Sequence, residues 1–147
     1  MPEDLIMRGQ TVSGGQETLN FGGRTPGYGY QITELSIYPS LSLGTSNVEL
    51  FASVTANDIG MDPLNVNFDS PGLIATSNYS TTYTGAYSSD RATVINDLFI
   101  ITQDLILMTT DTEGADPINW QCRFRKVKLS SSAEAVANFN QFTIYDV

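Results

Sequence analysis

Apolar side chains recur at every second position along much of this sequence, and this period limits the possible folds more than any other feature. In the clearest case Val48, Leu50, Ala52 and Val54 alternate with mostly polar residues up to Thr55. Successive side chains of a β-strand point to opposite faces of its sheet. The pattern therefore predicts a strand with one buried and one mostly polar face.

Further strands are expected on both sides of this segment. Tyr28 to Tyr38 is rich in aromatic and β-branched residues and stops at Pro39, which cannot donate to a ladder. The run from Leu98 to Met108 is apolar on both parities, which predicts a strand buried on both faces. Several short strands separated by turn signals favour an all-β fold, either a jelly roll or a β-sandwich, in a single domain of residues 28–147.

A further strand is expected around Trp120, Cys122 and Phe124. The apolar parity then switches to Val127 and Leu129, which predicts a β-bulge near residues 125 and 126.

The two ends of the chain differ from this pattern. Residues 1–27 contain six Gly and two Pro and are otherwise mostly polar, so we expect an extended, Gly-rich N-terminal arm. Near the C-terminus, Ser131 to Glu134 reads as a capping box ahead of an Ala-rich helix that reaches Phe142. Ala135, Phe139 and Phe142 share one face at helical spacing, and we expect this face to close one end or edge of the sandwich.

The composition excludes several functions. The 147 residues include no His and one Cys, Cys122, which removes His-based catalysis, the usual zinc ligand sets and an intrachain disulfide. Seven basic against sixteen acidic residues give a charge of -9, so we expect no nucleic-acid binding. The start MPEDLIMRGQ lacks the basic and apolar parts of a signal peptide, and no apolar stretch is long enough to span a membrane. We expect no secretion by a signal peptide, no membrane contact and no required cofactor.

Two loops share the pattern Gly-x-Asp-Pro-(Leu/Ile)-Asn, one with Asp58 and Asp62 and one with Asp111, Glu113 and Asp116. Gly, Asp and Pro are turn-forming residues, so both segments read as equivalent turns at one end of the sandwich. The alternative is a structural calcium ion, because these carboxylates are hard oxygen ligands.

Carboxylates are also the main route to catalysis in a chain without His. A glycosidase could use a pair of them, but no spacing selects one among the candidates Asp58, Asp62, Asp69, Asp97, Asp104, Asp111 and Asp116. Asp104 lies inside an apolar run and would need an Arg or a backbone amide as its partner. We expect no catalytic residues.

Two further groups of residues are candidates for contact surfaces. Four of the seven basic residues lie close together: Arg123, Arg125, Lys126 and Lys128. They protect an edge strand, contact an acidic neighbouring subunit or, as a third alternative, bind an anionic ligand. Tyr79, Tyr83 and Tyr87 share one parity of a strand. They either cover a face of the sheet or form an interface.

The acidic, His-free β domain, the Gly-rich start and the closing segment NWQCRFRKVKLS at residues 119–130, followed by Ala133-Glu134-Ala135, resemble small virion structural proteins of tailed bacteriophages. The similarity is to capsid decoration or cement proteins and to other accessory head or tail proteins. It implies a jelly-roll or sandwich subunit, present in many copies, whose arms or edge strands lie on a capsid lattice.

The first functional hypothesis is therefore a non-enzymatic virion protein, assembled in the host cytoplasm, that binds copies of itself, the major capsid protein or another virion protein. The alternative is a carbohydrate-binding β-sandwich, as in a phage adhesin, with Trp120 and the three Tyr residues as platforms on which sugar rings stack.

Overall fold

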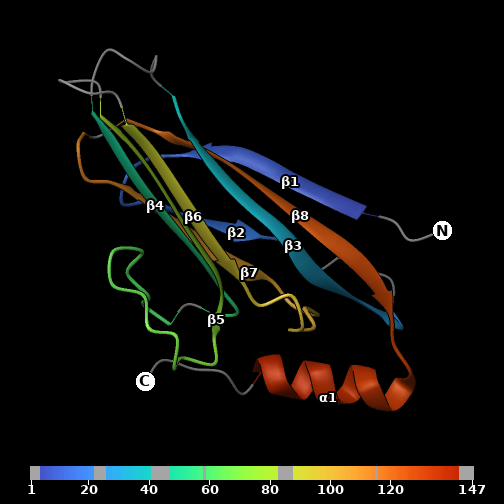
Figure 1. The fold of residues 1–147 in the computed structure, drawn as a ribbon. Coiled ribbons are helices and arrows are strands. Elements are labelled where there is room, and N and C mark those ends of the chain that lie inside the picture. Colours follow the sequence, from blue (N-terminus) through green and yellow to red (C-terminus); the bar gives the residue numbers. More distant parts are fainter. Residues whose placement is uncertain are drawn as a thin grey trace.

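The computed structural model describes residues 4–21, 26–40, 47–57, 59–82, 88–114 and 116–142, without the side chains of residues 82, 88, 89 and 142. These residues form two antiparallel β-sheets and one helix (Figure 1). The all-β class expected from the apolar period is confirmed.

The smaller sheet has three strands in the order β1-β8-β3, and the larger has five in the order β2-β7-β4-β5-β6. The strands are β1 (Asp4–Thr11), β2 (Gln16–Leu19), β3 (Tyr28–Pro39), β4 (Val48–Thr55), β5 (Leu73–Thr82), β6 (Ser88–Ile95), β7 (Leu105–Asp111) and β8 (Ile118–Lys128). The helix α1 (Ser131–Phe142) lies at one end of the sheets (Figure 1).

The strand order is that of a jelly roll with one exception. The first strand pairs with the eighth, the second with the seventh and the fourth with the fifth, as in a long hairpin folded over onto itself. Continuing that scheme would pair β6 with β3, but β6 pairs with β5 instead. Among the described residues, β3 therefore has a partner strand only on its β8 side.

The core lies between the two sheets and follows the alternation that the sequence shows. Val48, Leu50, Ala52 and Val54 of β4 are all buried, as predicted. From the smaller sheet, Phe124 lies in the same core and meets Phe21 edge-on, with ring centroids 5.0 Å apart. Aromatic pairs favour this geometry, which adds specific contacts to the burial of apolar surface.

The prediction of an extended N-terminal arm over residues 1–27, outside a domain of residues 28–147, is wrong. Residues 4–11 are β1, which pairs along its full length with β8, and residues 16–19 are β2, which pairs with β7. Leu5 and Met7 pack against the core while Ile6 and Arg8 lie on the other face, so a period of two is present but short. Both segments are therefore part of the chain's own sheets, each as an edge strand that pairs on one side among the described residues.

The β-bulge predicted near residues 125 and 126 of β8 is found instead in the neighbouring strand, β3. β8 pairs without interruption with β1, whereas the register with β3 shifts between Ile32 and Glu34. Thr33 is the additional residue, and its hydroxyl donates to the carbonyl of Arg123 at 3.2 Å. The bulge moves the inward parity of β3 from Ile32 to Leu35.

The helix forms where predicted but presents a different face. Its N-cap is Ser130, whose hydroxyl accepts from the amide of Ala133 at 3.1 Å. Ala135 and Phe139, which we expected to pack inward, are exposed, whereas Ala137 and Gln141 are buried. Phe142 is the remaining member of the expected face, and its side chain is outside the described residues.

The strand expected from Leu98 to Met108 is also shorter than predicted. Only the part from Leu105 onward is in β7, and Ile101 makes a single bridge to Tyr30. Asp104 is exposed, and its carboxylate accepts from the backbone amide of Phe21 at 2.6 Å. A backbone amide was one of the two partners that the sequence reasoning required for Asp104.

Candidate functional site

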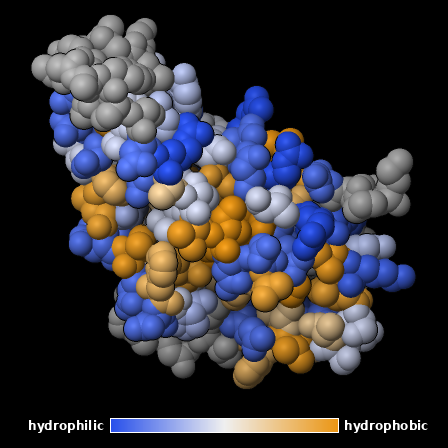
Figure 2. Space-filling model, in the orientation of Figure 1, coloured by the Kyte–Doolittle hydropathy of each residue, from blue (hydrophilic) through white to orange (hydrophobic). Residues whose placement is uncertain are grey.

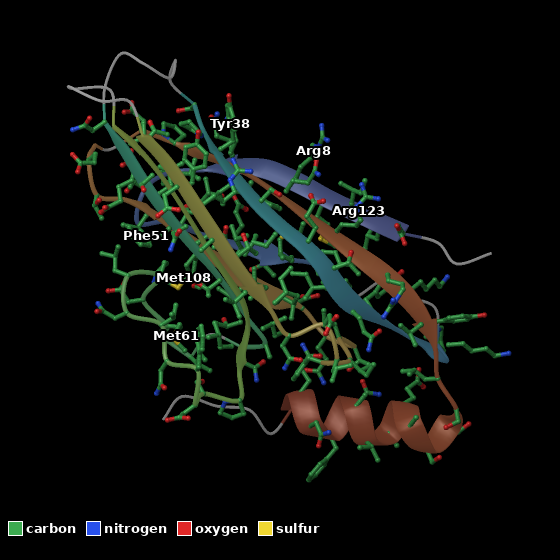
Figure 3. The ribbon with its side chains drawn as sticks, viewed as in Figure 1. Arg8, Tyr38, Phe51, Met61, Met108 and Arg123 are labelled. Carbon is green, nitrogen blue, oxygen red and sulfur yellow. The ribbon has the colours of Figure 1, made fainter. Side chains whose placement is uncertain are left out.

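The outer face of the β1-β8-β3 sheet carries polar side chains in rows that cross the three strands. Because the strands are in register, one row places Arg8 beside Gln121 and Ser36, and the next places Gln10 beside Asn119 and Tyr38. Figure 3 shows Arg8 and Tyr38 on this side of the molecule, and Figure 2 shows mostly hydrophilic colours over the same strands.

Hydrogen bonds connect the residues within these rows. Arg8 donates to Gln121 at 2.5 Å within its row, and Gln121 donates at 2.9 Å to Glu34, which lies outside both rows. In the next row Gln10 donates to Asn119 at 3.0 Å. Cross-strand pairs of this kind hold the polar side chains in defined positions on the sheet.

Between the two rows lies a hollow that we call the trough. It has a volume of about 590 Å³, and its lining comes from β1, β8, the edge of β3 and Arg91 of β6. Gly9, Ile37 and Trp120 lie between the rows in the strand sequences. A Cβ on Gly9 would lie 3.0 Å from Cζ2 of Trp120, so a larger residue here would require the indole ring to shift.

Tyr38, Tyr79 and Arg91 pack against one another at one end of the trough. Tyr38 is 52% exposed, and its ring centroid is 6.2 Å from that of Tyr79, which is buried. The guanidinium carbon of Arg91 lies 4.7 Å from the centroid of the Tyr79 ring, within the range of a cation–π contact. Tyr79 thus fixes both an exposed ring and a cation beside the trough.

The charges of the described residues are unevenly distributed. The basic residues among them are Arg8 on β1, Arg91 on β6 and the four basic residues of β8. The trough has two arginines in its lining and no carboxylate, in a chain with sixteen acidic residues. It is therefore a positively charged hollow on an acidic protein.

The single cysteine faces the core beneath this sheet. Burial, and then the nearby charge of Glu34, raise the pKa of the Cys122 thiol from 9.0 to about 12. The thiol is therefore protonated at neutral pH, and a thiolate nucleophile is not available at this position.

The sequence matches no protein-family model and no curated protein.

The four basic residues of β8 make different contacts in the structure. β8 pairs with β1 and β3 at Arg123 and Arg125, so protection of an edge strand is wrong for these two residues, whereas Lys126 and Lys128 lie beyond the last residue of β8 that pairs with β1. Arg123 lies 3.4 Å from Asp4, and Arg125 donates to Gln31 at 2.6 Å. Lys126 lies 4.5 Å from the centroid of the Tyr28 ring, and Lys128 is exposed at the end of the strand.

The aromatic platforms expected for sugar binding are also corrected. Trp120 and Tyr79 are only 8% and 6% exposed, and the indole N–H of Trp120 donates to the hydroxyl of Thr11 at 2.9 Å. Tyr83 and Tyr87 lie outside the described residues. The exposed ring at the trough is Tyr38, which the sequence reasoning used only to mark the end of a strand.

The two repeated loops are not equivalent turns at one end of the sandwich. β4 and β7 are antiparallel, so the loop after Thr55 and the loop after Asp111 lie at opposite ends of their sheet. Gly60 has a positive φ of 67°, whereas Gly114 is not among the glycines with positive φ.

The carboxylates of these loops make local hydrogen bonds. Asp62 accepts from the amide of Leu64 at 2.9 Å, and Asp111 accepts from the amide of Glu113 at 3.0 Å, which is Asx-turn geometry. Asp116 lies beside a hollow of about 30 Å³ together with Asp111 and Glu113. In the described part of the chain no three His, Cys, Asp or Glu residues form a group that could hold a metal ion, and Asp58 lies outside that part.

Sequence reasoning missed most of the trough. The alternation of Arg8 and Gln10 with Gly9 is a strand signal, but it was assigned to the arm. Asn119 and Gln121 alternate with the buried residues of β8 and could have been assigned to its outer face. Nothing in the sequence indicated that Arg91, on a strand of the other sheet, reaches this hollow.

No helix of the described residues is long and apolar enough to cross a membrane.

Proposed function

We propose that this protein is a non-enzymatic structural protein of a virion. It would be a capsid decoration or cement protein, or another accessory head or tail protein, that binds neighbouring protein subunits through the open edge of β3. The observation that carries the proposal is the strand order, in which β6 is not in the position beside β3 that a complete jelly roll would give it.

The edge of β3 is bonded within the chain at Tyr30 and at the carbonyl of Leu35, and it leaves the N–H of Leu35 and the backbone groups of Ile37 for a partner. Tyr30 exchanges two backbone hydrogen bonds with Ile101, so its N–H and C=O point away from β8. After the bulge, the carbonyl of Leu35 lies 3.5 Å from the hydroxyl of Thr93, so this residue also points away from β8. Because backbone direction alternates along a strand, the N–H and C=O of Ile37 lie on the same side.

An open edge of this kind favours strand addition. β3 has twelve residues and is bridged to Ile101 only at Tyr30 on this side, and edges left unpaired are normally shortened, covered or protected by charge because they pair with other chains. Addition of a strand from another subunit is a common mode of recognition. Exposed apolar side chains near the helix supply a second contact surface: Leu98 is 79%, Phe139 66% and Val136 58% exposed.

The proposal is tested on particles. Virus particles from a culture that produces this protein are separated on a density gradient, and each fraction is probed with an antibody against the purified chain. We expect the protein in the particle fractions, in many copies per particle, after a high-salt wash. Its presence only in the fractions that contain free protein would contradict the proposed function. Light scattering of the purified chain then shows whether the bound neighbour is a second copy or a different virion protein.

A further inference from the structure

We propose that the trough binds an acidic oligosaccharide, a function beyond the contacts between subunits described above. Its volume of about 590 Å³ falls within the roughly 300–1,000 Å³ typical of small-molecule sites. It lies on the outer face of the sheet, where a ligand can enter without any movement of the core.

The sides of the trough are suited to hydroxyl groups. Gln10, Asn119 and Gln121 present primary amides, each of which has two N–H donors and an oxygen acceptor. Bonds within the chain use one N–H of Arg8 and one of Gln10, and they use the oxygen and one N–H of both Asn119 and Gln121. A guanidinium has five N–H donors, so most of the hydrogen-bonding capacity of Arg8 remains for a ligand.

Tyr38 adds a flat apolar surface at the end of the trough. A pyranose ring has an apolar face of C–H groups that packs on an aromatic ring, and Tyr38 is half exposed while Tyr79 supports it from below. Tyr79 is a positioning residue in this arrangement, because it also holds Arg91 through the cation–π contact.

The charge of the lining selects for an anion. Arg8 and Arg91 come from different sheets and both contribute to the trough, and the described residues that form its lining include no carboxylate. Apart from the four basic residues of β8, the rest of the chain is acidic and repels anions, which favours binding of an anionic ligand at this hollow. Carboxylate and sulfate groups on a sugar both accept the paired N–H donors of a guanidinium.

The direction of the trough favours a saccharide over an acidic peptide. An extended peptide binds to a sheet by a backbone ladder along an edge strand. The trough instead crosses β1, β8 and β3, and its sides are rows of side chains. It therefore offers many separate side-chain hydrogen bonds and one stacking surface, which matches a chain of sugar rings.

The test uses calorimetry with the full-length chain and four probes: a galacturonic acid hexamer, a heparin hexasaccharide, maltohexaose and hexaglutamate. The variants are Tyr38→Ala and the double variant Arg8→Gln/Arg91→Gln. The matched controls are Phe139→Ala, an exposed aromatic on the helix, and Lys128→Gln, an exposed cation at the far end of β8. Fluorescence of Trp120, the only Trp, checks that each variant retains the sheet.

We expect at least one acidic hexamer to bind, the carboxylated and the sulfated probes identifying which anion is preferred. Loss of charge-assisted hydrogen bonds in the Arg double variant weakens this binding roughly ten-fold or more. Tyr38→Ala also weakens it, and both controls bind as the unmodified protein does. Equal binding of maltohexaose, equal binding of hexaglutamate, no binding of either acidic hexamer, or binding that the trough variants leave unchanged would each overturn the proposal.

Discussion

The side chain of Gln141 provides a sharp test of how the helix is attached to the sheets. It is fully buried, and its oxygen accepts from the amides of Thr102 and Gln103 at 2.9 and 3.1 Å. Its amide group donates to the carbonyls of Gln103 and Asp104 at 3.0 and 3.3 Å. One side chain thus satisfies four backbone groups in the segment that leads into β7.

Replacing Gln141 by Met keeps the volume similar and removes all four hydrogen bonds. A buried polar group left without a partner costs about 1–3 kcal/mol. Thr102 is buried, whereas Asp104 is exposed and its carbonyl can bind water. We therefore expect one or two of the four backbone groups to remain buried without a hydrogen-bond partner. The free energy of unfolding should then fall by about 2–4 kcal/mol. For a chain of this length the corresponding fall in Tm is roughly 5–15 °C.

The measurement is urea unfolding at equilibrium, followed by Trp120 fluorescence and circular dichroism, with the m-value checked for a change in the denatured state. Ala135→Met is the matched control, because this helical residue is exposed and both residues are good helix formers. A Gln141→Met variant within about 0.5 kcal/mol of the unmodified protein would refute the reasoning that these bonds hold the helix in place.

Three further predictions concern other contacts. Gly9→Val forces Trp120 away from β1, so we expect a loss of about 1–3 kcal/mol and a red shift of its emission; an unchanged spectrum would contradict the close packing. Asp104→Ala removes the acceptor for the amide of Phe21 and should lower stability by about 1–3 kcal/mol, whereas Asp104→Asn, which keeps an oxygen acceptor, should cost less in the same unfolding assay. Because the folded pKa of Cys122 is raised from 9.0 to about 12, its contribution to stability is complete below pH 9 and is lost as the pH rises toward 12. A Cys122→Ala variant that loses stability over this range as steeply as the unmodified protein would contradict that assignment.

Local patterns in the sequence predicted the strands and the helix better than they predicted which strands pair with one another. The alternation in Val48 to Val54 and the capping signal at Ser131 to Glu134 depend on residues close in sequence, and both segments form as expected, except that the cap is Ser130. The helix face was wrong because a buried amide that binds backbone groups, Gln141, looks polar in a helical pattern.

The trough depends on pairings between distant parts of the chain. Gln10 and Asn119 form a row only because β1 pairs with β8, and Arg91 reaches Tyr79 only because β6 pairs with β5. No local period specifies such register, since a strand segment is compatible with many partners. The residue types were visible in the sequence, but their juxtaposition was not.

Hydrogen exchange at the edge of β3 tests the central claim most directly. Amide exchange is measured for the purified chain and for the same chain in particles, at the backbone N–H groups of Leu35 and Ile37. The account predicts fast exchange in the isolated chain, where no strand pairs with this edge among the described residues, and strong protection in the particle. Equal exchange in both states would show that the edge of β3 is not where this protein binds its neighbours.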